Sequence, residues 1–222
     1  QTINGSLQGL GLVFVPAQAL LCGIGAIAFP IFAFAFTEGF VHTCNKGKFL
    51  GRLLLFALIS ELPFDLTFFS GYAQGSLFFW GHQNVFFTFA IALGGLWLLE
   101  LAGKVKQKPL AIMVQGAVVL LSCCLAEFVV KGDYEGYGVF LIIVTYLTRK
   151  NRLVQALAML AVKLLFDRFY YPVSFLFSLA LILLYNGQRG EKKMKMFFYW
   201  FYPVHIAAIG ILNWLVFYVL WR

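Results

Sequence analysis

Residues Val85–Ala102 read VFFTFAIALGGLWLLELA, an uninterrupted apolar run in which only Glu100 is charged. A transmembrane helix needs about 20 mainly apolar residues, and a helix satisfies all its backbone hydrogen bonds internally in lipid. The whole chain has this character, because 62% of its 222 residues are hydrophobic and 12% are charged. A soluble domain has about 25% charged residues. The composition therefore excludes a water-soluble domain and predicts an integral membrane protein.

Similar apolar runs lie on both sides of this one and give nine candidate spans. They are Leu7–Gly23, Ile24–Thr43, Phe49–Phe69, Val85–Ala102, Pro109–Val130, Tyr134–Thr148, Leu153–Phe166, Pro172–Tyr185 and Met196–Trp221. The sixth to eighth runs are shorter than a full crossing needs. No repeat or polar linker separates the runs. We therefore expect residues 1–222 to form a single all-α domain, a polytopic bundle of about nine transmembrane helices.

The basic residues alternate between the connections. The connections after the second, fourth, sixth and eighth runs hold 13 of the 17 Lys and Arg residues. This is the positive-inside pattern, and it predicts a cytosolic N-terminus and a multi-pass protein of the cytoplasmic (inner) membrane. A net charge of +8 spread in this way is not a nucleic-acid-binding face. The four cysteines have no C-x-x-C spacing, and neither a disulfide nor a metal is expected.

Two carboxylates inside the third run are candidates for function. A charge at membrane depth costs at least ~2.5–3.5 kcal/mol, so each one needs a reason. Glu61 and Asp65 are four residues apart and share one helical face, and Pro63 between them is expected to bend the helix. The pair could transfer protons or bind a cation. It could equally be structural and fix the bundle.

Two histidines are candidate bases. His82 precedes the fourth run, where Gln83 or Asn84 could cap the helix, and Asp65 could orient the imidazole. His205 lies about nine residues into the last run, roughly 14 Å deep. Alternatively, His82 is only interfacial and His205 only makes an interhelical hydrogen bond.

The inner surface carries further candidates. We expect Glu38 to contact Arg52 and so clamp the loop between their runs, with a part in anion binding as the alternative. The sequence has no P-loop, dinucleotide fingerprint or nucleophile elbow. The basic loops are the natural site for a phosphorylated cofactor, unless their charges only set the topology.

Several strings resemble the TraX family, in order from about residue 10 to residue 205. They are AFPIFAF from Ala28, EGF from Glu38, HT from His42, the segment from Arg52 that ends ISELPFDL at Leu66, HQNVFFT from His82, YGV from Tyr137, YNGQRG from Tyr185 and YPVH from Tyr202. The family is named for an enzyme of conjugative plasmids that acetylates the N-terminus of pilin. The resemblance implies a multipass acetyltransferase that uses acetyl-CoA as co-substrate.

The chain departs from the family pattern at one place. Gln8 and Gly9 stand where the pattern has an Asp-His pair, and Ala26 stands where it has an Arg. If that pair supplies the catalytic base, this chain is an inactive member.

Two functions follow from these observations. In the first, the chain transfers acetyl from cytosolic acetyl-CoA to an amine or hydroxyl of a peptide, glycan or lipid-linked acceptor. His82 or His205 would deprotonate the acceptor, and Glu61 or Asp65 would assist. The expected cofactor-binding residues are Arg52, Lys46, Glu38, Asn186 and Arg189. The alternative is a small ion-coupled transporter or an inactive membrane partner. Membrane lipid surrounds the chain in either case, and an oligomer is compatible with both.

Overall fold

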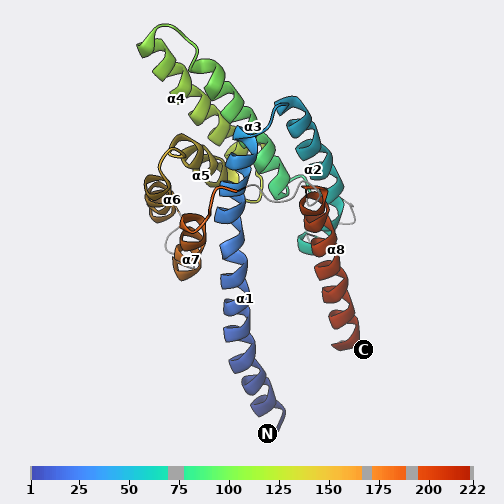
Figure 1. The fold of residues 1–222 in the computed structure, drawn as a ribbon. Coiled ribbons are helices and arrows are strands. Elements are labelled where there is room, and N and C mark those ends of the chain that lie inside the picture. The colour runs from blue at the N-terminus through green and yellow to red at the C-terminus, as the bar shows by residue number, and fades with distance from the viewer. Residues whose placement is uncertain (1, 70–77, 167–171, 189–194, 221–222) are drawn as a thin grey trace. The chain divides into compact units, whose positions relative to one another are not determined.

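The computed structural model describes residues 2–69, 78–166, 172–188 and 195–220. These residues are helical almost throughout (Figure 1). The elements are α1 (Thr2–Val41), α2 (Lys46–Phe68), α3 (Val85–Ala102), α4 (Lys108–Cys124), the π-helix η1 (Leu125–Val130), α5 (Glu135–Leu147), α6 (Arg152–Phe166), α7 (Pro172–Leu183) and α8 (Lys195–Leu220). The described part contains no strand, only an isolated bridge between Gln83 and Gly132. The prediction of an all-α protein is confirmed.

Within the described residues, four helices are long and apolar enough to cross a membrane. They contain Cys22–Val41, Val85–Ala102, Lys108–Val130 and Met196–Leu215. The helices Glu135–Leu147 and Pro172–Leu183 are apolar but shorter. The prediction of a membrane protein rests on these helices, while the count of nine spans and the cytosolic N-terminus stay predictions.

The first two expected spans form one continuous helix. α1 runs for 40 residues without a break at Gly23. The segment CGIGAIA from Cys22 has no proline or polar residue that would end a helix. A glycine in a helix interior costs only about 1 kcal/mol relative to alanine, so the glycines there do not interrupt it.

The chain folds into two compact units, Gln1–Glu38 with Val144–Asn186, and Gly39–Ile143 with Gly187–Arg222. We call them unit 1 and unit 2. The unit boundaries fall inside α1 and α5. The prediction of a single domain is not tested by this division.

In unit 1, α7 and α1 are tied by a hydrogen bond that Ser178 Oγ donates to the carbonyl of Ile27 at 3.1 Å. The rings of Phe34 and Tyr185 meet edge to face, with centroids 5.3 Å apart. The guanidinium of Arg152, at the start of α6, lies over both rings. These contacts tie both α6 and α7 to α1.

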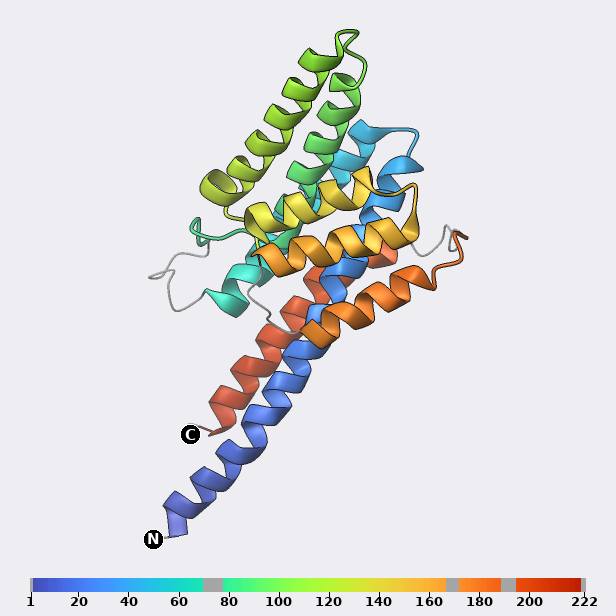
Figure 2. The ribbon, with the colours of Figure 1, turned by 90° about the vertical axis from the view of Figure 1, so that its left-hand side faces the viewer.

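In unit 2, α3 is the central helix and packs against α2 and α4, while α8 packs against α2. The hairpin of α3 and α4 is seen side by side in both views (Figure 1, Figure 2). Gly95 lets α3 approach α4, since a Cβ there would lie 2.8 Å from Ser122 Oγ. Thr67 Oγ1 donates to the carbonyl of Ile206 at 3.2 Å and ties α2 to α8. These contacts fix the end of α2 where the candidate carboxylates lie.

Candidate functional site

Glu61 and Asp65 lie on the buried face of α2 and are the centre of the candidate site. Their side chains are only 7% and 2% exposed, as the shared helical face predicts. α2 continues through Pro63 between them. Both residues therefore belong to one continuous helix that faces α3.

Asn84 holds Glu61 against the start of α3. Its side-chain oxygen accepts a hydrogen bond from the N–H of Phe86 at 3.0 Å, so of the two expected caps, Gln83 and Asn84, it is Asn84 that caps α3. Its amide group donates to the carbonyl of Ala57 at 2.8 Å and to Glu61 Oε2. One side chain thus caps α3 and joins it to α2. The capping role was expected from the sequence, but the link to Glu61 was not.

Each carboxylate has one oxygen that is held and one that is not. Asp65 Oδ2 accepts a hydrogen bond from the backbone N–H of Phe79 at 2.7 Å, and Glu61 Oε2 accepts from Asn84. Within the described residues, Glu61 Oε1 and Asp65 Oδ1 are buried without a hydrogen-bond partner. A buried acceptor without a partner is costly, so these two atoms mark a place for a ligand or a proton.

Both carboxylates line a cavity of about 250 Å³. Its other walls come from the segment before α3 and from α3 itself, with the side chains of Phe78, Phe79, Trp80, Gln83 and Phe87, and from Leu58 of α2. The cavity is therefore mostly aromatic, with acidic groups on one side.

His82 directly precedes Gln83 of the cavity wall and faces Asp133. Its Nε2 is 3.8 Å from Asp133 Oδ1, and its ring packs on Phe64 and Phe69 with centroids 6.1 and 5.4 Å apart. Asp133 raises the pKa of His82 above its usual value, although partial burial opposes this. The expected orienting carboxylate was Asp65, but the carboxylate that the structure brings to the imidazole is Asp133.

The loop that carries Asp133 is held in place by its backbone. Lys131 ends the π-helix in the left-handed region, with φ 53°. Its carbonyl accepts a hydrogen bond from the N–H of Gln83 at 2.9 Å, which fastens the loop to the segment that contains His82. No spacing in the sequence relates Asp133 to His82, because the contact depends on this long-range bond.

His205 lies one turn beyond Tyr202 on α8. Its Nδ1 is 2.8 Å from the carbonyl of Phe201, and its ring stacks on that of Phe201 at 4.8 Å. Tyr202 packs against both His205 and Phe86, with centroids 5.5 and 5.2 Å away. In the described part of the chain, His205 is thus linked to the first turn of α3 through Tyr202. The hydroxyl of Tyr202 is buried, and Tyr202 was not among the candidate site residues expected from the sequence.

The expected cofactor-binding residues fall in both units. In unit 2, Lys46 pairs with Glu100 and lies 4.5 Å over the ring of Phe40. Burial and the neighbouring charge of Lys104 lower the pKa of Lys46. Arg52 lies over the rings of Phe49 and Tyr199, at 5.8 and 6.0 Å, with its Nε buried and unpartnered in the described residues.

In unit 1, Glu38 pairs with Arg152 across 3.3 Å. Asn186 is exposed just beyond α7. The expected contact between Glu38 and Arg52 would join the two units and stays a prediction. Arg189 lies outside the described residues.

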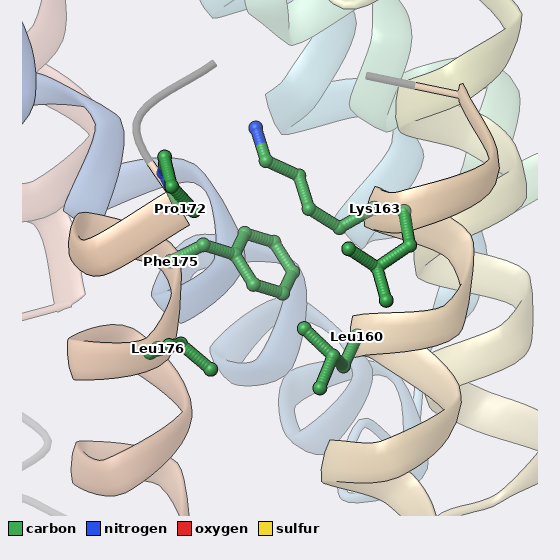
Figure 3. A pocket seen from close by; sticks show the side chains of 6 residues that line it. Leu160, Lys163, Pro172, Phe175 and Leu176 are labelled. Atoms are coloured by element: carbon green, nitrogen blue, oxygen red, sulfur yellow. The ribbon is translucent and has the colours of Figure 1, made fainter. Parts of the chain in front are cut away.

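A second cavity, of about 260 Å³, lies between α6 and α7 in unit 1. Lys163 extends from α6 toward the start of α7, with its Nζ 5.6 Å from the centre of the Phe175 ring (Figure 3). The other walls are apolar, formed by Leu160, Leu164, Pro172 and Leu176.

Among the described residues, no cluster of three or more His, Cys, Asp or Glu side chains could hold a metal ion.

Comparison with known proteins identifies the chain by family. No solved structure matches it significantly. It is 31% identical over 204 residues to the probable fimbrial assembly protein FimC, serogroup H1, of Dichelobacter nodosus, a match that covers 84% of this chain and 80% of that protein. The model of the TraX protein family matches residues 7–213. The match spans nearly the whole chain and includes α2, α3, His82 and His205. The chain therefore belongs to the TraX family.

Proposed function

We propose that this chain is an acetyltransferase of the cytoplasmic membrane that moves acetyl from acetyl-CoA to an amine or hydroxyl of an envelope acceptor. Membership of the TraX family supports the reaction class. The name of the relative, a fimbrial assembly protein, supports a role in the assembly of surface appendages. The observation that carries the proposal is the His82–Asp133 pair beside a cavity with two buried carboxylates.

His82 is the proposed general base. Since Nε2 faces Asp133, Nδ1 is the ring nitrogen that would take the proton of the acceptor. The acceptor nitrogen or oxygen then attacks the thioester carbonyl, the carbon–sulfur bond breaks, and the imidazolium returns its proton to the CoA thiolate. Asp133 would stabilise the imidazolium and fix the ring, as the carboxylate of a His–Asp pair does.

Glu61 and Asp65 would contact the acceptor. Each has one oxygen held by a protein N–H, so each carboxylate is oriented before the acceptor arrives. Such preorganisation avoids the cost of ordering the groups during the reaction. The pair would hold a protonated acceptor amine, or would accept the proton that the ammonium must lose before its nitrogen can attack.

The phosphates of acetyl-CoA would bind at the opposite end of α2 and α3. Lys46 and Lys104 lie in that region, and a phosphate there would compete with Glu100 for the ammonium group of Lys46. Fifteen residues separate Lys46 from Glu61, about 22 Å along the helix at 1.5 Å per residue. The thioester arm would therefore extend along α2 toward His82.

The test is release of CoA thiol from acetyl-CoA by the purified protein in lipid nanodiscs, with a panel of amine and hydroxyl acceptors. We expect His82→Ala to lose about 100-fold or more in rate, the usual worth of a general base. Asp133→Asn should lower the rate while acetyl-CoA still binds. His42→Ala is the matched control, because His42 is exposed at the end of α1 and should keep the wild-type rate. An absence of acetyl-CoA binding to the folded wild-type protein would refute the proposal.

A proton- or ion-coupled transporter is the second candidate. It is favoured by one oxygen each of Glu61 and Asp65 that has no partner in the described part of the chain, as is typical of a protonation site inside a membrane protein. An inactive membrane partner is favoured by the absence of the family's Asp-His pair at Gln8 and Gly9. Transport predicts proton or ion flux into liposomes that Glu61→Gln abolishes and that is indifferent to CoA.

A further inference from the structure

The cavity between α2 and α3 presents two carboxylate oxygens, Glu61 Oε1 and Asp65 Oδ1, that have no hydrogen-bond partner among the residues that the structure describes. The second oxygen of each carboxylate is already bonded, by Asn84 and by the N–H of Phe79. The orientation of both groups is therefore set by the protein. Residues four apart on a helix have Cβ atoms about 5–6 Å apart, so one small cationic group can reach both oxygens.

The remaining walls favour an organic cation. Phe78, Phe79, Trp80 and Phe87 line the cavity. Aromatic faces attract ammonium groups within about 6 Å of the ring centre. A hard metal ion would instead need a fuller set of oxygen ligands. A primary ammonium has three N–H donors, enough for both free carboxylate oxygens with one left for Gln83.

The cavity opens beside an apolar helix face. Leu58 lines the cavity and is 68% exposed, and Leu62 and Leu66 continue the same face of α2 at 40% and 50% exposed. In a membrane, such a face contacts acyl chains. Trp80, 82% exposed at the cavity, suits the membrane–water interface, where Trp is enriched.

We propose that this cavity binds the primary ammonium headgroup of a membrane lipid, as in an aminophospholipid. An ammonium joined to acyl chains satisfies the carboxylates, the aromatic walls and the leucine face together. A soluble amine would contact the carboxylates and the aromatic walls but not the leucine face. This cavity is the one in which the proposed function places the acceptor, so in the proposed reaction the lipid amine would take the acceptor's place. Lipid binding itself is measured without acetyl-CoA, and its result does not depend on whether the chain transfers acetyl groups.

The first test varies the lipid and leaves the protein unchanged. The purified protein is equilibrated with phosphatidylethanolamine, its N-methyl and N,N-dimethyl forms, and phosphatidylcholine, and the retained lipid is measured by native mass spectrometry. Affinity should fall stepwise as methyl groups replace N–H donors, by about tenfold or more over the series. Equal retention across the series, or stronger retention of phosphatidylglycerol, would overturn the proposal.

The second test varies the protein. Glu61→Gln and Asp65→Asn keep the side-chain shapes, and their combination should remove the preference for phosphatidylethanolamine over phosphatidylcholine. Glu135→Gln is the control, because that carboxylate is at an exposed position outside the cavity and the preference should persist. A double variant with a wild-type size-exclusion profile and an undiminished preference would refute the assignment.

A competition experiment separates a lipid ligand from a peptide ligand. A short apolar peptide with a free α-amino group and its N-acetylated form are each added to the protein loaded with phosphatidylethanolamine. Both should leave the lipid bound. Displacement by the free amine alone would assign the cavity to a peptide and overturn the lipid proposal.

Discussion

Replacing Asn84 by alanine tests whether the link between α2 and α3 holds the site together. The side chain of Asn84 makes three interactions, with the N–H of Phe86, the carbonyl of Ala57 and the carboxylate of Glu61, while its backbone N–H also donates to Glu61 Oε2 at 3.4 Å and is kept in any variant but proline. Loss of an N-cap costs about 1 kcal/mol. Loss of the donor to a buried carboxylate adds about 1–3 kcal/mol. We therefore expect Asn84→Ala to lower the free energy of unfolding by about 2–4 kcal/mol.

Asn45 provides a matched control. It is the N-cap of α2, its side chain accepts from the N–H of Lys48 at 2.8 Å, and this bond is exposed. Asn45→Ala should therefore lose only the capping contribution, about 1 kcal/mol. Asn84→Ser keeps a cap but loses the donors, and should fall between the two.

The assay is reversible unfolding by SDS in mixed micelles, followed by far-UV circular dichroism for all three variants and the wild type. Equal losses for Asn84→Ala and Asn45→Ala would refute the reasoning. Asn84 would then be only a cap, and Glu61 would not depend on it.

Two further predictions concern the packing of α3 and the charge of His82. Gly95→Ala should destabilise the protein by about 1–3 kcal/mol in the same SDS assay, because its Cβ would meet Ser122 Oγ at 2.8 Å. Gly94→Ala is the control and should be neutral or slightly stabilising, because a Cβ at Gly94 would have no atom within 4 Å. Equal effects of the two substitutions would contradict the close approach of α3 and α4. Because the pKa of His82 is raised in the fold, its contact with Asp133 stabilises the folded state fully at pH values below the unfolded pKa of about 6.5. This stabilisation is lost as the pH rises through the folded pKa. The difference in unfolding free energy between wild type and Asp133→Asn should therefore be larger at pH 5.5 than at pH 8.5, and a difference independent of pH would contradict it.

The helices were largely predictable, because lipid demands long apolar runs whatever the tertiary contacts. Val85–Ala102 was predicted with both of its ends, and Asn84, one of the two caps expected from the sequence, begins it. The break at Gly23 was wrong, because a glycine alone does not end a helix in an apolar segment.

The candidate site was predictable only where it lies within one helix. The four-residue spacing of Glu61 and Asp65 determines that they share a face. The pairing of His82 with Asp133 depends on a left-handed residue at Lys131 and on a backbone bond over 48 positions of sequence, which local patterns do not encode. Glu38 likewise pairs with Arg152, whose position depends on the packing of α6 in unit 1.

The most direct test of the proposed function follows the acetyl group itself. Membranes that contain the wild-type chain or its His82→Ala variant, at equal abundance, are incubated with acetyl-CoA labelled in the acetyl group. The labelled envelope molecules are then identified by mass spectrometry. We predict a labelled acceptor in the wild-type membranes that is absent with His82→Ala and present with His42→Ala. Equal labelling with His82→Ala, or none above membranes that lack the chain, would contradict acetyl transfer by the His82–Asp133 site.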